Sequence, residues 1–204
     1  MSSISLRQDL LSRLHWPIFS PLTTIQFLDT NGTLVPFTTH PLASIPLAST
    51  PLNKLHVLID TCSERAAHDE GDGGPGSYIP PEPLIFSGSP ITLLDFVVKT
   101  HGYLNAHRED IVECEEEVYD GGGVRVDGGG RNILDGKGFW FDFAGEYGVE
   151  EDEVDGQVFV GLWVEGNGGV GVGEWWGERR REVEGVGGSE EGEKGERGVG
   201  VREK

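Results

Sequence analysis

Hydrophobic and polar residues alternate along several short segments of the chain, a pattern that predicts β-strands with one buried face. The alternation covers residues 54–59, 139–144 and 158–164. Two further apolar runs, 24–28 and 33–35, flank Asn31-Gly32, a dipeptide typical of two-residue hairpin turns. Together these segments predict a small, mostly antiparallel sheet.

Two helices are predicted from apolar residues at three- and four-residue spacing. The first begins after Pro90, where Thr92 and Asp95 have the spacing of a capping box, and it ends near residue 104. The second covers residues 106–119 and places its glutamates largely opposite its apolar side. Thr92 and Asp95 are therefore expected to determine the fold as a helix cap. The fold class predicted is α+β, with one or two helices packed on one face of the sheet.

Composition divides the chain into one domain with two different ends. All 11 prolines lie at or before residue 90, whereas 25 of the 32 glycines follow residue 120. A length of 204 residues allows one ordinary domain rather than two. The predicted organisation is an N-terminal arm at 1–13, a single domain at 14–165, and flexible loops at 65–80 and 121–130.

The last segment, residues 166–204, is of low complexity and has 13 glycines in 39 positions. Its few apolar residues predict a disordered Gly-rich acidic tail. Ala, Pro, Thr, His and Gln, whose codons all contain cytosine, are absent from it. Two origins stay open: a read-through intron or shifted frame, or an interaction tail with Arg179-Arg180-Arg181 as a basic cluster.

The net charge of −19 argues against nucleic-acid and anionic-membrane partners, because both require basic protein surfaces. No apolar run approaches the ~20 residues that span a bilayer, and the N-terminus lacks the apolar core of a signal peptide. We therefore expect a soluble intracellular protein in the cytoplasm or nucleus.

Residues with reactive side chains are few. Cys62 and Cys114 are too few for a disulfide framework and are predicted to be reduced thiols. Cys114 lies between two glutamates, which are expected to raise its pKa and which indicate a structural role. His101 and His107 would lie ~120° apart around a helix and would not share a zinc-ligand face.

No catalytic, cofactor-binding or metal-binding residue is predicted. The stretch 151–156 matches the first half of a calcium loop, but Leu162 stands where the bidentate glutamate belongs. No nucleophile elbow, phosphate loop or dinucleotide fingerprint occurs.

The leading functional hypothesis is a non-enzymatic protein-interaction or scaffold module that binds a basic or Pro-reading partner through an acidic helix face and further exposed residues. The residues expected on this surface are Trp16, Pro36, Pro41, Pro46 and Pro51. An equally open alternative is that they cover the sheet. A small hydrolase-like or metal-assisted enzyme with a site near His56, Asp95 and His101 is the second hypothesis. A misannotated or degraded gene product without selected function is the third.

Four short segments also occur in a recognisable order. They are Leu14-His15-Trp16-Pro17, Pro51-Leu52-Asn53-Lys54-Leu55-His56-Val57, Ile91-Thr92-Leu93-Leu94-Asp95-Phe96-Val97 with Tyr103-Leu104, and Phe159-Val160-Gly161-Leu162. Together they resemble a fungal family of uncharacterised domains, domain of unknown function 6699, over about residues 14–165. The resemblance implies an α+β domain without assigned activity, so it transfers no catalytic residue.

Overall fold

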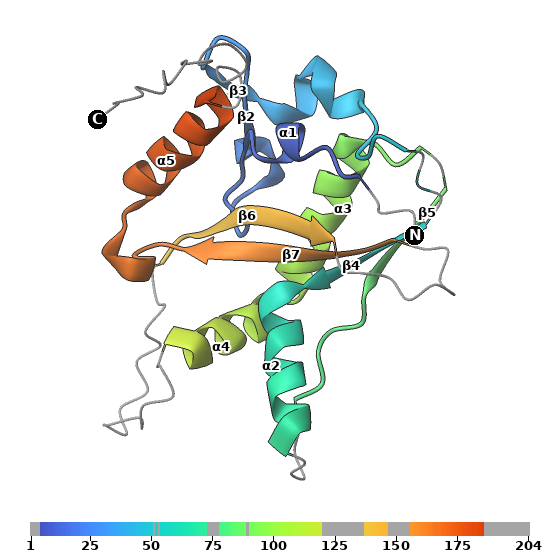
Figure 1. Ribbon diagram of the computed structural model, residues 1–204, viewed down its shortest axis with the longest axis vertical. Helices are drawn as coiled ribbons and strands as arrows, with labels where there is room; N and C mark the ends of the chain where they lie inside the picture. Colours follow the sequence, from blue (N-terminus) through green and yellow to red (C-terminus); the bar gives the residue numbers. More distant parts are fainter. Residues whose placement is uncertain are drawn as a thin grey trace, which may run out of the picture.

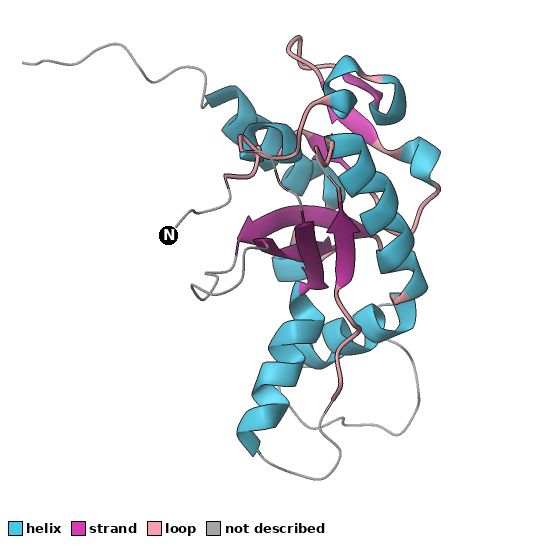
Figure 2. Cartoon of the chain, turned by 90° about the vertical axis from the view of Figure 1, so that its right-hand side faces the viewer, coloured by secondary structure: helices cyan, strands magenta, loops and turns pink. Residues whose placement is uncertain are grey.

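The computed structural model describes residues 5–50, 52, 54–72, 78–88, 90–119, 137–146 and 156–185. They form helices and two sheets in which antiparallel pairs dominate, so the predicted α+β class is confirmed. In Figure 1, helix α3 (Leu93–Ala106) passes behind the larger sheet, whereas α2 (Asp60–Asp72) and α4 (Arg108–Tyr119) lie below it. Figure 2 shows the same sheet with helices along one side and below.

The larger sheet has four strands in the order β5-β4-β7-β6. The strands are β4 (Lys54–Ile59), β5 (Leu84–Ser87), β6 (Phe139–Glu146) and β7 (Gly156–Val164). The central pair, β4 and β7, is parallel, and the two outer pairs are antiparallel. On β4 buried and half-exposed residues alternate, which confirms the predicted period of two. The pattern does not predict β5, because four residues are too few to establish a period.

The smaller sheet is antiparallel and contains β1 (Leu14–His15), β2 (Gln26–Leu28) and β3 (Leu34–Pro36). The predicted hairpin turn joins β2 to β3. One carboxylate oxygen of Asp29 accepts hydrogen bonds from the backbone N–H groups of Asn31 (2.9 Å) and Thr33 (2.8 Å). Gly32 has a φ of 75°, a conformation that favours glycine.

Helix α3 begins at the expected cap. The Thr92 hydroxyl accepts a hydrogen bond from the Asp95 N–H (3.1 Å), and the Asp95 carboxylate accepts one from the Thr92 N–H (3.2 Å). Both halves of the capping box are therefore present, and they satisfy backbone donors that the first helical turn leaves without partners. The hydrogen bond from the Thr92 hydroxyl is the main reason that the pKa of Asp95 is lowered.

Residues 65–72 form the second half of α2, so the prediction of a flexible loop at 65–80 is wrong for them. The acidic and glycine residues at the end of this helix favour turns when judged by local propensity alone. Packing of α2 against α4 and β7 outweighs that propensity. Residues 73–77 and the predicted loop at 121–130 lie outside the described residues.

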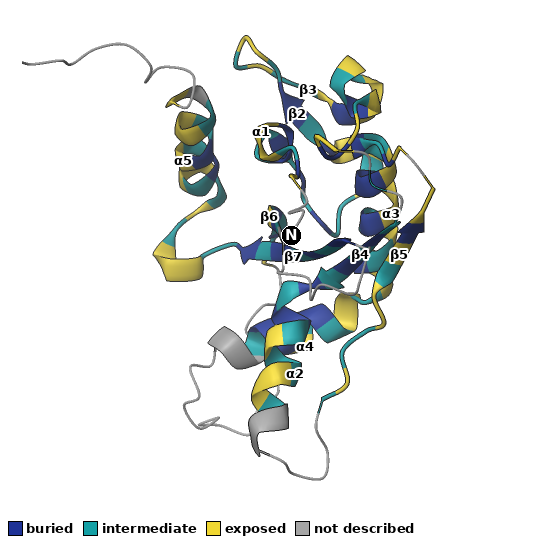
Figure 3. Cartoon of the chain, turned by 45° about the vertical axis from the view of Figure 1, so that its right-hand side comes forward, coloured by how far each residue is buried: buried dark blue, intermediate teal, exposed yellow. Residues whose placement is uncertain are grey.

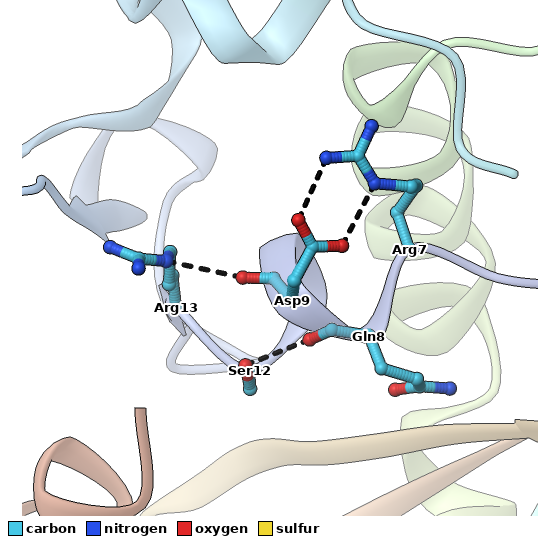
Figure 4. Close-up of polar contacts among 5 residues, drawn as sticks. All are labelled: Arg7, Gln8, Asp9, Ser12 and Arg13. Carbon is cyan, nitrogen blue, oxygen red and sulfur yellow. Dashed lines mark hydrogen bonds and ion pairs between the residues drawn. The ribbon is translucent and has the colours of Figure 1, made fainter. Parts of the chain in front are cut away.

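The N-terminal residues belong to the folded unit, so a separate arm at 1–13 is not observed for the described residues 5–13. The short helix α1 (Gln8–Leu11) buries two leucines, and the Gln8 side chain donates to the Ala144 carbonyl of β6 at 2.7 Å. At the start of this helix, the Arg7 guanidinium makes two hydrogen bonds of 2.8 and 2.7 Å with the Asp9 carboxylate (Figure 4). The Gln8 hydrogen bond ties the segment to the larger sheet, whereas the Arg7–Asp9 pair lies within the segment.

Residues 166–185 are folded as well. A short turn, η4 (Asn167–Gly169), leads into helix α5 (Val172–Gly185), which lies beside the smaller sheet in Figure 1. The disorder expected for 166–204 is therefore wrong for 166–185, and residues 186–204 lie outside the described residues. The physical reason is that Trp175 and Trp176 each find an aromatic partner in the domain, Trp163 and His15 respectively.

Candidate functional site

Trp16 was expected on an interaction surface, but the structure places it in the core. Its side chain is fully buried, and its ring stacks on Phe141 with centroids 5.1 Å apart. The indole N–H donates to Nδ1 of His101 at 3.2 Å. A tryptophan whose single donor finds an acceptor in the interior satisfies both its apolar and its polar parts. Trp16 therefore cannot contact a partner.

The predicted prolines lie on the surface wherever the structure describes them. Pro36, Pro41 and Pro46 are exposed, and Pro51 lies outside the described residues. Backbone hydrogen bonds fix the segment between them at the start of α3; in one, the Leu47 N–H donates to the Ile91 carbonyl at 2.9 Å. Two short turns, η2 (Phe37–Thr39) and η3 (Pro41–Ser44), interrupt the extended backbone. The exposed prolines consequently do not form a continuous polyproline II helix.

The second hypothesis requires His56, Asp95 and His101 to share one site, and the structure does not assemble them. Leu55 pairs with Phe86 of β5, and the Phe86 ring stacks on Phe96 of α3 with centroids 6.1 Å apart. Leu55 therefore lies on the sheet face that α3 covers. Successive strand residues point to opposite faces, and His56 therefore points away from α3. Asp95 instead belongs to the cap of α3, and His101 accepts the hydrogen bond from the Trp16 indole.

The described residues contain no group of three His, Cys, Asp or Glu side chains that could hold a metal ion. His107 instead lies 3.2 Å from the Asp110 carboxylate on its own helix. Residues 151–155 of the calcium-loop-like stretch lie outside the described part of the chain.

Helices α2 and α4 bring Cys62 and Cys114 together. Helix α2 begins directly after β4, which places Cys62 in its first turn, and α4 packs alongside α2. Both are free thiols and both are 1% exposed. The two thiol groups interact with each other, and this interaction is the largest influence on the pKa of each. They are the only two cysteines of the chain, and the sequence does not predict that they meet.

Two further side chains complete what we call the thiol cluster. The thiol cluster consists of Cys62, Arg65, Tyr78 and Cys114. Arg65 donates from Nη1 to the Cys114 sulfur at 3.8 Å and lies 3.3 Å from the Glu113 carboxylate. Its guanidinium covers the Tyr78 ring, 4.3 Å from the centroid. The Tyr78 backbone N–H donates to Asp69 at 2.9 Å, which holds this residue beside α2. The buried Tyr78 hydroxyl lies near both sulfurs.

The electrostatics of the thiol cluster favour a thiolate at Cys114. The interaction with Cys62 is the largest influence, and with the nearby Tyr78 hydroxyl and Arg65 it outweighs burial and lowers the pKa of Cys114 to about 6. The same interaction and burial raise the pKa of Cys62. The expectation that neighbouring glutamates raise the pKa of Cys114 is wrong, because the interactions with Cys62, Tyr78 and Arg65 lower it instead.

Glu115 is a buried carboxyl group beside the thiol cluster, at 8% exposure. Burial is the main reason that its pKa is raised to about 7, and the negative charges of Cys114, Glu64 and Asp60 add to the effect. A hydrogen bond with Thr61 partly opposes it. The folded chain thus favours the protonated form of Glu115.

Replacing Glu115 with Gln is expected to remove a pH-dependent loss of stability. The folded-state pKa lies above the ordinary value of 4.5, so this group's stabilising contribution is complete below pH 4.5 and is lost as the pH rises through about 7. In the wild type we expect this loss to be on the order of 2 kcal/mol by pH 8. Urea unfolding at several pH values measures it. Glu109→Gln on the same helix is the control, and an unchanged pH dependence in Glu115→Gln would contradict the assignment.

The outer sides of α2 and α4 form an acidic surface. Helix α2 carries five acidic residues and α4 carries six, against one arginine on each. Arg65 turns toward the thiol cluster, and Arg108 lies over an aromatic ring at 4.9 Å. We define the acidic face as Asp60, Glu64, Glu109, Glu113 and Glu116. Glu64, Glu109 and Glu113 are exposed, and Figure 3 shows exposed positions along the outer side of α2.

Comparison of the chain with protein-family profiles, with curated proteins and with solved structures gives no match. The resemblance to the fungal domain family therefore stays a prediction. Within the described part of the chain, no helix combines the length and apolar character needed to cross a membrane.

Proposed function

We propose that this chain is a non-enzymatic protein-interaction or scaffold domain whose acidic face binds a basic protein surface. The observation that carries the proposal is the side-by-side packing of α2 and α4, which brings the acidic face together. Arg65 pairs with Glu113 at 3.3 Å, and Arg108 lies over an aromatic ring. The net charge of −19 adds long-range attraction for a basic partner and accelerates encounter.

A basic partner fits better than a Pro-reading partner. Pro-reading domains bind a continuous polyproline II segment, whereas η2 and η3 separate the exposed prolines of this chain. The two free thiols suit a reducing compartment, so we place the protein in the cytoplasm or nucleus.

The proposal predicts that a basic peptide loses affinity when the acidic face is neutralised. The probe is a fluorescein-labelled peptide of nine lysines, and the dissociation constant is measured by fluorescence anisotropy with the full chain. The variant combines Glu64→Gln, Glu109→Gln and Glu113→Gln. Three exposed ion pairs at ~0.5 kcal/mol each correspond to roughly tenfold weaker binding.

The matched control neutralises three exposed glutamates on α5, outside the acidic face. It combines Glu174→Gln, Glu178→Gln and Glu182→Gln, so its net charge equals that of the first variant. We expect this control to weaken binding by less than about twofold, because screening limits charges that lie away from the peptide. Equal weakening in both variants would mean that the peptide responds to net charge alone. That result, or no binding by the wild type, would reject the acidic face as the binding surface.

A further inference from the structure

We propose that Cys62 and Cys114 form an oxidisable dithiol that reacts with hydrogen peroxide and closes a disulfide between α2 and α4. The inference is independent of the proposed interaction function. It rests on the burial of both cysteines within the packed α2–α4 pair, on the hydrogen bond from Arg65 Nη1 to the Cys114 sulfur at 3.8 Å, and on the interaction between the two thiols. A pair held only for packing does not need a guanidinium donor at one sulfur.

Cys114 is the sulfur that attacks the peroxide. The thiolate is the nucleophilic form of cysteine, and a neighbouring cation or hydrogen-bond donor increases its population. Arg65 supplies both to Cys114, because its charged guanidinium donates a hydrogen bond to the sulfur at 3.8 Å. Cys62 keeps its proton under the same conditions and is therefore the resolving thiol.

The reaction has two balanced steps. In the first, the Cys114 thiolate attacks one peroxide oxygen, the O–O bond breaks, and the departing hydroxide takes up a proton and leaves as water; Cys114 becomes a sulfenic acid. In the second, the Cys62 sulfur attacks the Cys114 sulfur, the S–O bond breaks, and the Cys62 proton leaves with the hydroxyl as a second water. Two thiols are oxidised to one disulfide, and one peroxide is reduced to two waters.

Because both sulfurs are buried, only a small oxidant can reach them. Each cysteine is 1% exposed, so a bulky disulfide such as oxidised glutathione cannot approach in line with the Cys114 sulfur while the chain is folded. Hydrogen peroxide is about the size of two water molecules and needs only a small opening. Small-scale opening of packed helices is common in folded proteins, and it would provide this access.

The test measures oxidation of the reduced full chain by a small molar excess of hydrogen peroxide. Remaining thiols are alkylated with iodoacetamide after denaturation, and intact mass spectrometry counts the added groups. We expect the oxidised wild type to take up no iodoacetamide and its mass to be lower than that of the reduced chain by two hydrogen atoms. Oxidised glutathione should leave both thiols available. If both thiols stay available after peroxide while the circular dichroism spectrum stays native, or if they react only in urea, the proposal is wrong.

Single-cysteine variants identify the attacking sulfur. In Cys62→Ser the disulfide cannot form, so the sulfenic acid at Cys114 should be captured by dimedone. In Cys114→Ser the remaining thiol should react at least about tenfold more slowly, since burial still favours its protonated form. Equal dimedone labelling of both variants would overturn the assignment of Cys114. The wild-type mass measurement decides the disulfide itself even if one variant does not fold.

Arg65→Met tests the positioning role of the guanidinium through the pH profile of the rate. The groups facing Cys114 or its partner thiol are Cys62, Arg65, Tyr78, Asp110 and Glu115. We expect the wild-type rate to rise with an inflection near pH 6, and the variant to shift this inflection upward and to react roughly tenfold more slowly at pH 7. Arg181→Met, at an exposed arginine of α5, is the control. A wild-type profile in Arg65→Met would show that the guanidinium does not activate the thiol.

Discussion

Replacing Trp16 with Ala is expected to lower the free energy of unfolding by about 3–5 kcal/mol, the largest single effect that we predict for this chain. The side chain is fully buried, so truncation opens a cavity against the stacked ring of Phe141. It also leaves Nδ1 of His101 without the indole donor at 3.2 Å. Urea unfolding followed by far-UV circular dichroism measures the loss.

Trp16→Phe separates the two contributions. Phenylalanine keeps most of the ring volume but lacks the N–H group, so we expect a smaller loss of about 1–2 kcal/mol. Pro36→Ala, at an exposed proline, is the surface control and should change stability by less than about 0.5 kcal/mol. A loss below about 1 kcal/mol in Trp16→Ala would mean that this tryptophan is not part of the core.

The parts of the fold that follow from local sequence could be predicted. The alternation in β4, the hairpin turn at Asn31-Gly32 and the capping box of Thr92 and Asp95 each depend on residues within a few positions of one another. The same reasoning fails where tertiary contacts outweigh local propensity. Helix α2 ends in residues that favour turns, and its helical conformation depends on packing against α4 and β7.

The candidate sites could be predicted less well, because both depend on contacts between distant residues. The glutamates beside Cys114 in sequence suggested a raised pKa, but the deciding neighbours, Cys62 and Arg65, come from a helix about fifty residues earlier. A partial signal is present: Cys62 lies three residues after a predicted strand, and Cys114 lies within a predicted helix. One sequence does not specify that these two positions meet.

The Gly-rich composition of the C-terminal segment similarly concealed helix α5. Composition averages over 39 positions, whereas the packing depends on a few side chains, among them Trp175, Trp176 and Arg179. Trp175 stacks on Trp163 with centroids 4.7 Å apart and an angle of 8° between the rings. Such specific contacts do not favour the read-through origin for residues 166–185.

Replacing Trp176 with Ala is therefore expected to destabilise the whole domain by about 3 kcal/mol, although it lies in a low-complexity segment. The side chain is 8% exposed, and its ring meets His15 of β1 edge-on with centroids 4.7 Å apart. Its loss also loosens the turn that carries Arg179, which donates to the Ser12 carbonyl at 3.1 Å and to Asp142 at 3.0 Å. Unfolding in urea, followed by far-UV circular dichroism, measures the change.

Arg179→Ala and Arg181→Ala form a matched pair on the same helix. The Arg179 side chain is 10% exposed and joins α5 to β6 through Asp142, so its removal should cost about 2 kcal/mol. The Arg181 side chain is 75% exposed and its bonds stay within α5, so Arg181→Ala should change stability by less than about 0.5 kcal/mol. If Trp176→Ala and Arg179→Ala both behave like Arg181→Ala, then α5 does not contribute to the fold and the segment from residue 166 is dispensable. If the two arginines differ as expected, the domain extends at least to Arg179, because only a docked helix distinguishes them.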